Sequence, residues 1–243
     1  MILKGLRFFS LFIFALFFSN VKSQSINVAG LFPTIDHSGT ISNKLDYSFY
    51  YFAALPLVNF KKPTLSKDSY FHLLYLEQAL SYKVSYKFSL TGSYVYQRAN
   101  VVYDNYVNEN RFYFQAKYKH TLKNIDLTQR LRFDGRFIHN RVTNETPFTH
   151  RLRYLIGLDF SINQKLYFTS YEEAFFNTFE KANAVYGENW AYAALGKKLN
   201  EKNKIEIGLL YVTWNIGKTN WFNQYYLQAT WLTHINLQRT KTK

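Results

Sequence analysis

The sequence predicts an all-β fold: a single transmembrane, antiparallel, up-and-down β-barrel that follows a cleaved signal peptide. Two observations carry this prediction. At least ten segments alternate apolar and polar residues with period two, as in residues 88–98, 111–119 and 126–137. Successive side chains of a strand point to opposite faces, so each segment has one apolar and one polar face. The breaks between the segments alternate between short and long, which is typical of bacterial outer-membrane barrels.

Residues 1–23 have the pattern of a secretory signal peptide. Lys4 and Arg7 precede an apolar run at 8–18, and a cleavage site follows Ser23. The run is shorter than the roughly 20 residues that a transmembrane helix needs. We therefore expect this segment to be removed on export, with an uncleaved N-terminal anchor as the alternative.

Residues 24–243 are expected to form one outer-membrane β-barrel domain. The chain is 20% aromatic, has 4 Pro and has no Cys, which argues against disorder, disulfides and thiolate metal sites. Its formal net charge of +14 falls to +11 without Lys4, Arg7 and Lys22 of the signal. The cations alternate with aromatic residues along the strands instead of forming one run. We therefore expect contact with anionic headgroups of outer-membrane lipids and lipopolysaccharide, and no nucleic acid.

The strands are read in order from the breaks that separate them. Short breaks, rich in Asn and Ser, lie at 42–44, 84–86, 121–124, 162–165 and 200–203, and long breaks lie at 57–68, 99–108, 139–147, 177–185 and 215–220. Short breaks are expected to be periplasmic turns and long ones outer loops. If both chain ends lie in the periplasm, the strand number must be even. The sequence thus predicts twelve strands, with an outward strand at 25–32 that turns near Pro33. Ten strands is the alternative, because the first hairpin (25–42) has a ragged pattern.

The apolar faces carry more bulky side chains than the narrow interior of a small soluble barrel can hold. We therefore expect them to face lipid, and the lipid-facing candidates are Phe88, Leu90, Tyr94, Phe112, Phe114, Phe133, Tyr154, Ile207 and Trp231. The lumen-lining candidates on the opposite faces are Arg111, Lys117, Arg130, Arg132, Asp134, Arg136, Arg151, Arg153, Asp159 and Glu206. Two interpretations of these charges stay open. They form ion pairs that fill the lumen as a scaffold, or they make a basic lumen that selects anions.

The sequence offers no catalytic or metal-binding constellation, so we predict no catalytic residues, no metal site and no cofactor. His37 and Ser38 are neighbours on a strand and therefore point to opposite faces. The same holds for the acidic pair Glu172 and Glu173. The six histidines show no metal-ligand spacing; they are His37, His72, His120, His139, His150 and His234. A lipid hydrolase of the outer leaflet is the one enzymatic alternative.

Short motifs in the C-terminal half occur in a characteristic order. They are Arg151-Leu152-Arg153-Tyr154, Gly157-Leu158-Asp159-Phe160, Tyr171-Glu172-Glu173-Ala174-Phe175-Phe176-Asn177, Glu188-Asn189-Trp190, Leu195-Gly196, Lys198-Leu199-Asn200 and Ile205-Glu206-Ile207-Gly208-Leu209-Leu210-Tyr211. Over roughly residues 82–237 the chain resembles the domain-of-unknown-function 2490 family of gram-negative outer-membrane β-barrels. That family often has Arg where this chain has Trp190. The resemblance implies an outer-membrane barrel with no established activity and no catalytic residues to carry over.

We therefore expect a non-enzymatic barrel in the outer membrane of a gram-negative bacterium, either structural or a channel for small solutes with a preference for anions. The alternatives are an outer-leaflet lipid-active enzyme and a soluble secreted β-barrel that binds a hydrophobic ligand. The expected partners are outer-membrane lipids, lipopolysaccharide and, during biogenesis, the barrel-assembly machinery. A barrel of this size is compatible with a monomer.

Overall fold

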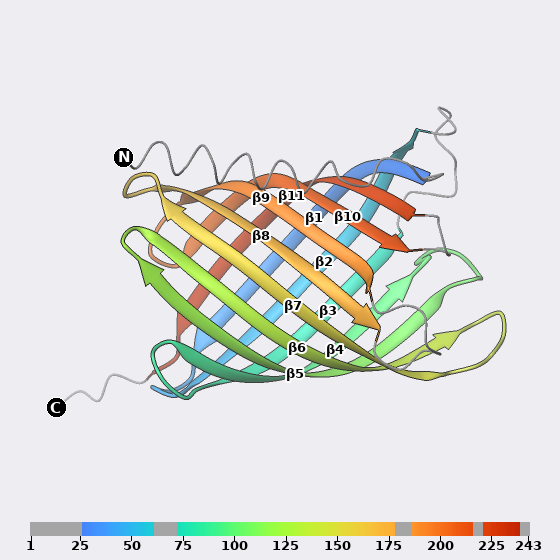
Figure 1. Cartoon of the computed structure of the whole chain (residues 1–243), viewed down its shortest axis with the longest axis horizontal. Coiled ribbons are helices and arrows are strands. Elements are labelled where there is room, and N and C mark those ends of the chain that lie inside the picture. Colours follow the sequence, from blue (N-terminus) through green and yellow to red (C-terminus); the bar gives the residue numbers. More distant parts are fainter. Residues whose placement is uncertain (1–25, 61–71, 178–185, 216–220, 239–243) are drawn as a thin grey trace.

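The computed structural model describes residues 26–60, 72–177, 186–215 and 221–238, which form one closed barrel of eleven strands (Figure 1). The predicted signal at 1–23 lies outside these residues. In chain order the strands are β1 (Ile26–Thr40), β2 (Leu45–Asn59), β3 (Leu73–Lys83), β4 (Phe88–Ala99), β5 (Val107–Leu122), β6 (Ile125–Asn140), β7 (Phe148–Ser161), β8 (Leu166–Asn177), β9 (Tyr186–Lys198), β10 (Asn203–Asn215) and β11 (Trp221–Asn236). The all-β fold is confirmed. None of the described residues belongs to a helix long and apolar enough to cross a membrane.

Each strand pairs in antiparallel orientation with its neighbours in the chain, and the barrel closes by a parallel pairing of β1 with β11. The register of this seam is continuous from Ile26 opposite Phe222 to Thr40 opposite Asn236. Because β1 and β11 run in the same direction, the start of β1 and the end of β11 lie at opposite rims. We call the rim with the short breaks the turn rim and the other the loop rim.

The prediction of twelve strands is wrong, and so is the predicted turn near Pro33. A single strand, β1, runs straight through this residue. Period-two alternation continues on both sides of it, since Phe32 and Thr34 are buried inside while Leu31 and Ile35 are exposed outside. Proline removes one backbone donor without forcing a turn. The parallel closure also removes the requirement for an even strand number, which had made a twelfth strand necessary.

The breaks after the first strand are where the sequence predicts them. All five short breaks separate the end of one strand from the start of the next. Their polar side chains hold the backbone: the Ser42 hydroxyl accepts from the Leu45 amide at 3.1 Å, and the Asn163 side chain accepts from the Leu166 amide at 2.8 Å. Such local caps are the reason that Ser and Asn favour turns. The long breaks at 99–108 and 139–147 also separate two strands. The other three, at 57–68, 177–185 and 215–220, fall mostly on residues 61–71, 178–185 and 216–220, which lie outside the described part of the chain.

Candidate functional site

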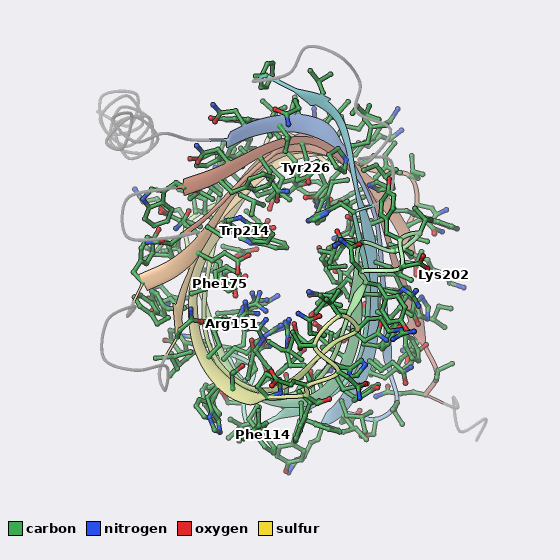
Figure 2. The ribbon with its side chains drawn as sticks, turned by 90° about the vertical axis from the view of Figure 1, so that its right-hand side faces the viewer. Phe114, Arg151, Phe175, Lys202, Trp214 and Tyr226 are labelled. Carbon is green, nitrogen blue, oxygen red and sulfur yellow. The ribbon has the colours of Figure 1, made fainter. Side chains whose placement is uncertain are left out.

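The wall of the barrel has an apolar outer face and a largely polar inner face. Figure 2, a view into the barrel, shows Phe114 pointing away from it while Arg151, Phe175, Trp214 and Tyr226 point inward. Eight of the nine residues predicted on the apolar face are exposed outside, namely Leu90, Tyr94, Phe112, Phe114, Phe133, Tyr154, Ile207 and Trp231. The ninth, Phe88, is half-buried at the turn rim and borders the interior cavity.

A cavity of about 1030 Å³ lies in the interior of the barrel. Its walls include Lys87 and His234 near the turn rim as well as His72 and Trp214 near the loop rim. In Figure 2 the side chains line the wall and leave the centre of the barrel clear. The cavity therefore extends between the two ends of the barrel.

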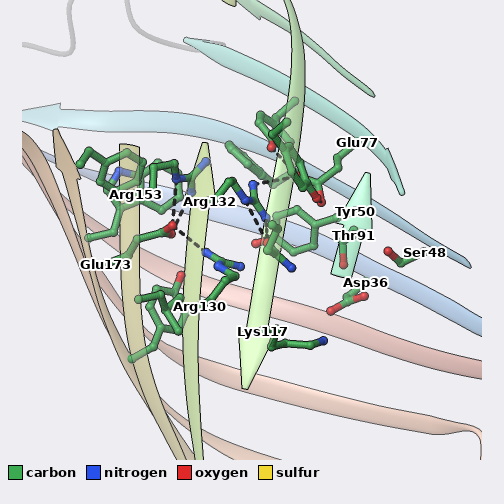
Figure 3. Close-up of a pocket in the computed structure, with 18 of the residues that line it drawn as sticks. Asp36, Ser48, Tyr50, Glu77, Thr91, Lys117, Arg130, Arg132, Arg153 and Glu173 are labelled. Carbon is green, nitrogen blue, oxygen red and sulfur yellow. Dashed lines mark hydrogen bonds and ion pairs between the residues drawn. The ribbon is translucent and has the colours of Figure 1, made fainter. Parts of the chain in front are cut away.

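Glu173 on β8 lies at the centre of an ion-pair network on the cavity wall (Figure 3). Arg153 donates two parallel hydrogen bonds to its carboxylate, each 2.8 Å long, and Arg130 lies 2.7 Å away. Glu173 is only 2% exposed. Two guanidinium groups thus compensate one buried carboxylate, and Arg153 binds it in the bidentate geometry that makes such pairs strong.

Asp134 on β6 holds the next part of the network together. Its Oδ2 atom accepts from Nε and Nη2 of Arg151, both at 3.2 Å, and lies 3.8 Å from Arg111 and 3.9 Å from Arg153. Arg151 also donates to Glu188 at 3.1 Å. Arg151 and Asp134 face each other across neighbouring strands, so the ion pairs expected from the sequence between adjacent segments are present.

Glu77 and Glu109 complete the network toward β3 and β5. Glu109 accepts from Arg111 at 2.6 Å and from Arg136 at 2.8 and 2.9 Å. Glu77 accepts from the hydroxyls of Tyr75 and Tyr113 at 2.6 and 2.5 Å and lies 3.4 Å from Arg132. Each arginine that faces the cavity therefore has a carboxylate within ion-pair distance.

Aromatic residues fill the opposite part of the interior. Phe32 and Phe52 stack at 4.4 Å, and Trp190 contacts both rings at about 6 Å. Trp190 is on β9, which β10 and β11 separate from β1, so these contacts cross the interior. Phe175 joins this cluster to the network, because Arg153 lies over its ring at 4.3 Å. Aromatic rings were predicted on the outer face, but they occupy both faces of the wall. Cation–π contacts explain how rings and arginines share the interior.

The predicted lumen residues do not all lie together. Asp159 is exposed near the turn rim. Glu206 is buried on β10, where it accepts from Tyr167 at 2.7 Å and from Tyr192 at 3.2 Å instead of pairing with an arginine. Sequence reasoning missed Glu77, although alternation through Tyr75, Glu77 and Ala79 would have placed it inside.

The charges on the cavity wall are unequal in number. Within the described part of the chain, ten cationic and five anionic residues line the cavity; they are Lys83, Lys87, Arg111, Lys117, Lys119, Arg130, Arg132, Arg136, Arg151 and Arg153 against Asp36, Asp46, Glu77, Glu173 and Glu188. Glu109 and Asp134 add two negative charges behind these arginines, so cations still outnumber anions. The arginines and Lys83 have carboxylate partners, whereas Lys87, Lys117 and Lys119, which lie toward the turn rim, have none within ion-pair distance among the residues that the structure describes. The positive excess therefore comes from lysines near one mouth.

His37 and His234, two of the described histidines, contact hydroxyl groups. Ser38 lies 3.0 Å from Nδ1 of His234, a pair that the sequence does not reveal because it joins β1 to β11. The other ring nitrogen of His234 faces the Thr40 hydroxyl, not a carboxylate. His37 contacts Thr233 and Tyr47. Burial lowers the pKa of His72.

The acidic neighbours Glu172 and Glu173 point to opposite faces, as alternation requires. Glu172 accepts from Asn189 at 3.2 Å, whereas Glu173 bonds to arginines inside. No group of His, Cys, Asp and Glu residues in the described ranges is arranged to hold a metal ion.

The family model of DUF2490, described as a protein of unknown function, matches residues 41–223. The chain belongs to this family. The match begins at the first turn and ends within β11, so it covers most of the barrel. The earlier resemblance to this family is thereby confirmed. A search of curated proteins gives no match to the chain.

Proposed function

We propose that this DUF2490 protein is a gram-negative outer-membrane β-barrel that conducts small solutes and prefers anions. The continuous cavity with its excess of cations carries the proposal. A basic inner wall lowers the energy of a passing anion and raises that of a cation.

The outer surface supports insertion into a membrane. On β5, β6 and β7 the outward positions carry no Asp, Glu, Lys or Arg, and Phe114 is 76% exposed. A soluble barrel would have to expose this apolar band to water, and such large exposed apolar surfaces mark membrane or protein contacts. The strands, of 11 to 16 residues, are long enough to cross a bilayer at a tilt.

The distribution of the ion pairs favours a conducting pore rather than a lumen that ion pairs fill completely. The network runs mainly along β5–β8, and the aromatic cluster fills the side of β1, β2 and β9. The two groups touch at Phe175 and line a common cavity. Both interpretations of the charged residues thus contribute: the arginines are scaffold, and unpaired lysines supply the positive excess.

Planar-bilayer recording tests this function. The refolded barrel is expected to give discrete conductance steps in KCl. Under a KCl gradient, its reversal potential should have the sign of an anion-preferring pore. Absence of current at every voltage, or a cation-preferring reversal potential, would contradict the proposal.

Membrane insertion is tested separately. The folded protein should need detergent and should migrate differently on a gel before and after heating. A chain that stays folded and monomeric without detergent would be a soluble barrel, and the membrane assignment would be wrong.

A further inference from the structure

Four cationic side chains lie together on the inner wall near the turn rim. We call Lys87, Lys117, Lys119 and Arg130 the basic patch. Lys117 is directly opposite Arg130 in the pairing of β5 with β6. The Lys119 amide donates to the Lys87 carbonyl at 2.8 Å, so these two lysines are also cross-strand neighbours. All four line the cavity.

This arrangement is electrostatically unfavourable without a counter-ion. Directly opposed side chains in a sheet have Cβ atoms about 5 Å apart, and like charges there destabilise the pairing. Among the described residues, no carboxylate lies within ion-pair distance of the three lysines. Three acids lie nearby. Asp46 pairs with Lys83 at 2.7 Å, and Asp126 accepts from Thr121 at 2.7 Å. Asp36 lines the same cavity and attracts Lys117 without reaching ion-pair distance, so one carboxylate faces three lysines. In Figure 3 Lys117 accordingly stands without a dashed contact.

A second observation indicates an absent acceptor. Arg130 uses Nη2 to contact Glu173, but its Nε atom is buried and has no hydrogen-bond partner. A buried unsatisfied donor costs free energy unless something accepts from it. Hydroxyl groups surround the same part of the cavity: Ser48, Ser81, Ser89 and Thr91 line it, and Ser89 is opposite Lys117. The surroundings therefore supply donors as well as positive charge.

We propose that the basic patch is a binding site for a phosphoryl dianion, the chemistry shared by inorganic phosphate and phosphate monoesters. This deepens the proposed function, on which it rests, by naming the anion. A phosphoryl group carries nearly two negative charges at neutral pH and three strong acceptor oxygens. It matches a site with several uncompensated cations and hydroxyl donors better than chloride or a monocarboxylate does. Lysine binds phosphate as a point charge, and arginine adds directed donors.

The test is a binding measurement that needs no current. Isothermal titration of the detergent-folded full chain with inorganic phosphate and, in parallel, with glucose 6-phosphate is carried out at constant ionic strength. Acetate and chloride are the monoanion comparisons. We expect saturable binding of both phosphates and weaker or no binding of the monoanions. Equal binding of acetate would overturn the assignment to a dianion. Tighter binding of either inorganic phosphate or glucose 6-phosphate supports the site and shows whether its ligand is free phosphate or a phosphate monoester.

The decisive variant is Lys117→Gln with Lys119→Gln. Loss of each charge-assisted contact is expected to weaken phosphate binding about tenfold. The matched control is Lys44→Gln with Lys165→Gln, which removes the same charge from exposed turns at the same rim outside the cavity wall. Each single variant, Lys117→Gln and Lys119→Gln, should show part of the effect. Heat-modifiable migration confirms that every variant is folded.

Unchanged phosphate binding in the Lys117→Gln, Lys119→Gln variant would refute the site. An equal loss in the control would show non-specific attraction to the rim, which also refutes it. Phosphate binding without conductance would reject the channel and retain the site. Anion-selective conductance without phosphate binding would reject the phosphate site and retain the channel.

Discussion

The variant Glu173→Gln tests whether the ion-pair network inside the barrel forms as described. The change keeps the volume of the side chain and removes one buried negative charge. Arg153 would lose one of its two short hydrogen bonds to the carboxylate, since an amide has a single acceptor oxygen. Arg130 would lose its partner at 2.7 Å. Two buried guanidinium groups would then be undercompensated.

The expected cost follows from this geometry. Removing one partner of a buried ion pair destabilises a protein by about 3–5 kcal/mol, because the remaining charge stays buried without compensation. Glu173 is 2% exposed and has two cationic partners, so we expect a loss in that range, or a factor of about 100 or more in the unfolding constant. Urea unfolding of the barrel in lipid vesicles, followed by tryptophan fluorescence, measures it.

The neighbouring Glu172→Gln is the matched control. It removes the same charge from the outer side of the same strand, where the Asn189 amide is the partner and Gln still accepts. We expect a change of about 0.5 kcal/mol or less there. If both variants lose the same stability, Glu173 is not buried among arginines, and the assignment of the charged face to the interior is wrong.

Three further predictions concern the wall of the barrel. Phe114→Lys, at the middle of the outer face, should reduce folding stability in lipid vesicles by about 2–4 kcal/mol, whereas a Lys in a turn should not; an equal effect at both places would speak against a lipid-facing surface. Gly196→Ala should cost about 1–3 kcal/mol in the same urea titration, because its Cβ would lie 2.1 Å from the Tyr167 ring; adding Tyr167→Ala should recover part of this loss, and additive losses would contradict the contact. Epitope tags placed before Ile26 and after Leu237 should be accessible from opposite sides of the membrane in intact cells, whereas access to both from one side would contradict the parallel closure.

The architecture was largely predictable because it depends on local pattern. Alternation in residues 111–119 identifies β5, and turn residues such as Ser42 and Asn163 hold their own backbone neighbours, so both signals lie within a few positions in the sequence. The closure was not predictable in this way. It depends on pairing β1 with a strand about 200 residues away, and nothing in the local pattern around Pro33 distinguishes an antiparallel from a parallel neighbour.

The interior was predictable only in its composition. Alternation gives the inward face of each strand, and it correctly directs Arg151 and Asp134 inward. It does not give the partner of each charge, because partners are not always on adjacent strands. Glu77 on β3, for example, accepts from Tyr113 on β5 and lies near Arg132 on β6, both beyond β4. Long side chains reach across the curved inner wall, and only the three-dimensional curvature of the barrel brings them together.

Because the arginines are paired with carboxylates, we expect the lysines, and not the arginines, to set the ion selectivity of the proposed pore. The sequence draws attention to arginines, because they dominate the inward faces of β6 and β7. Yet a guanidinium that shares a buried carboxylate presents little net charge to a passing ion, since the field of the pair falls off faster than that of a single charge. Lys117 and Lys119 lie at the cavity wall near the turn rim, and no carboxylate of the described residues is within ion-pair distance of them. Replacing arginines should therefore mainly destabilise the barrel, whereas replacing these lysines should mainly change which ions it admits.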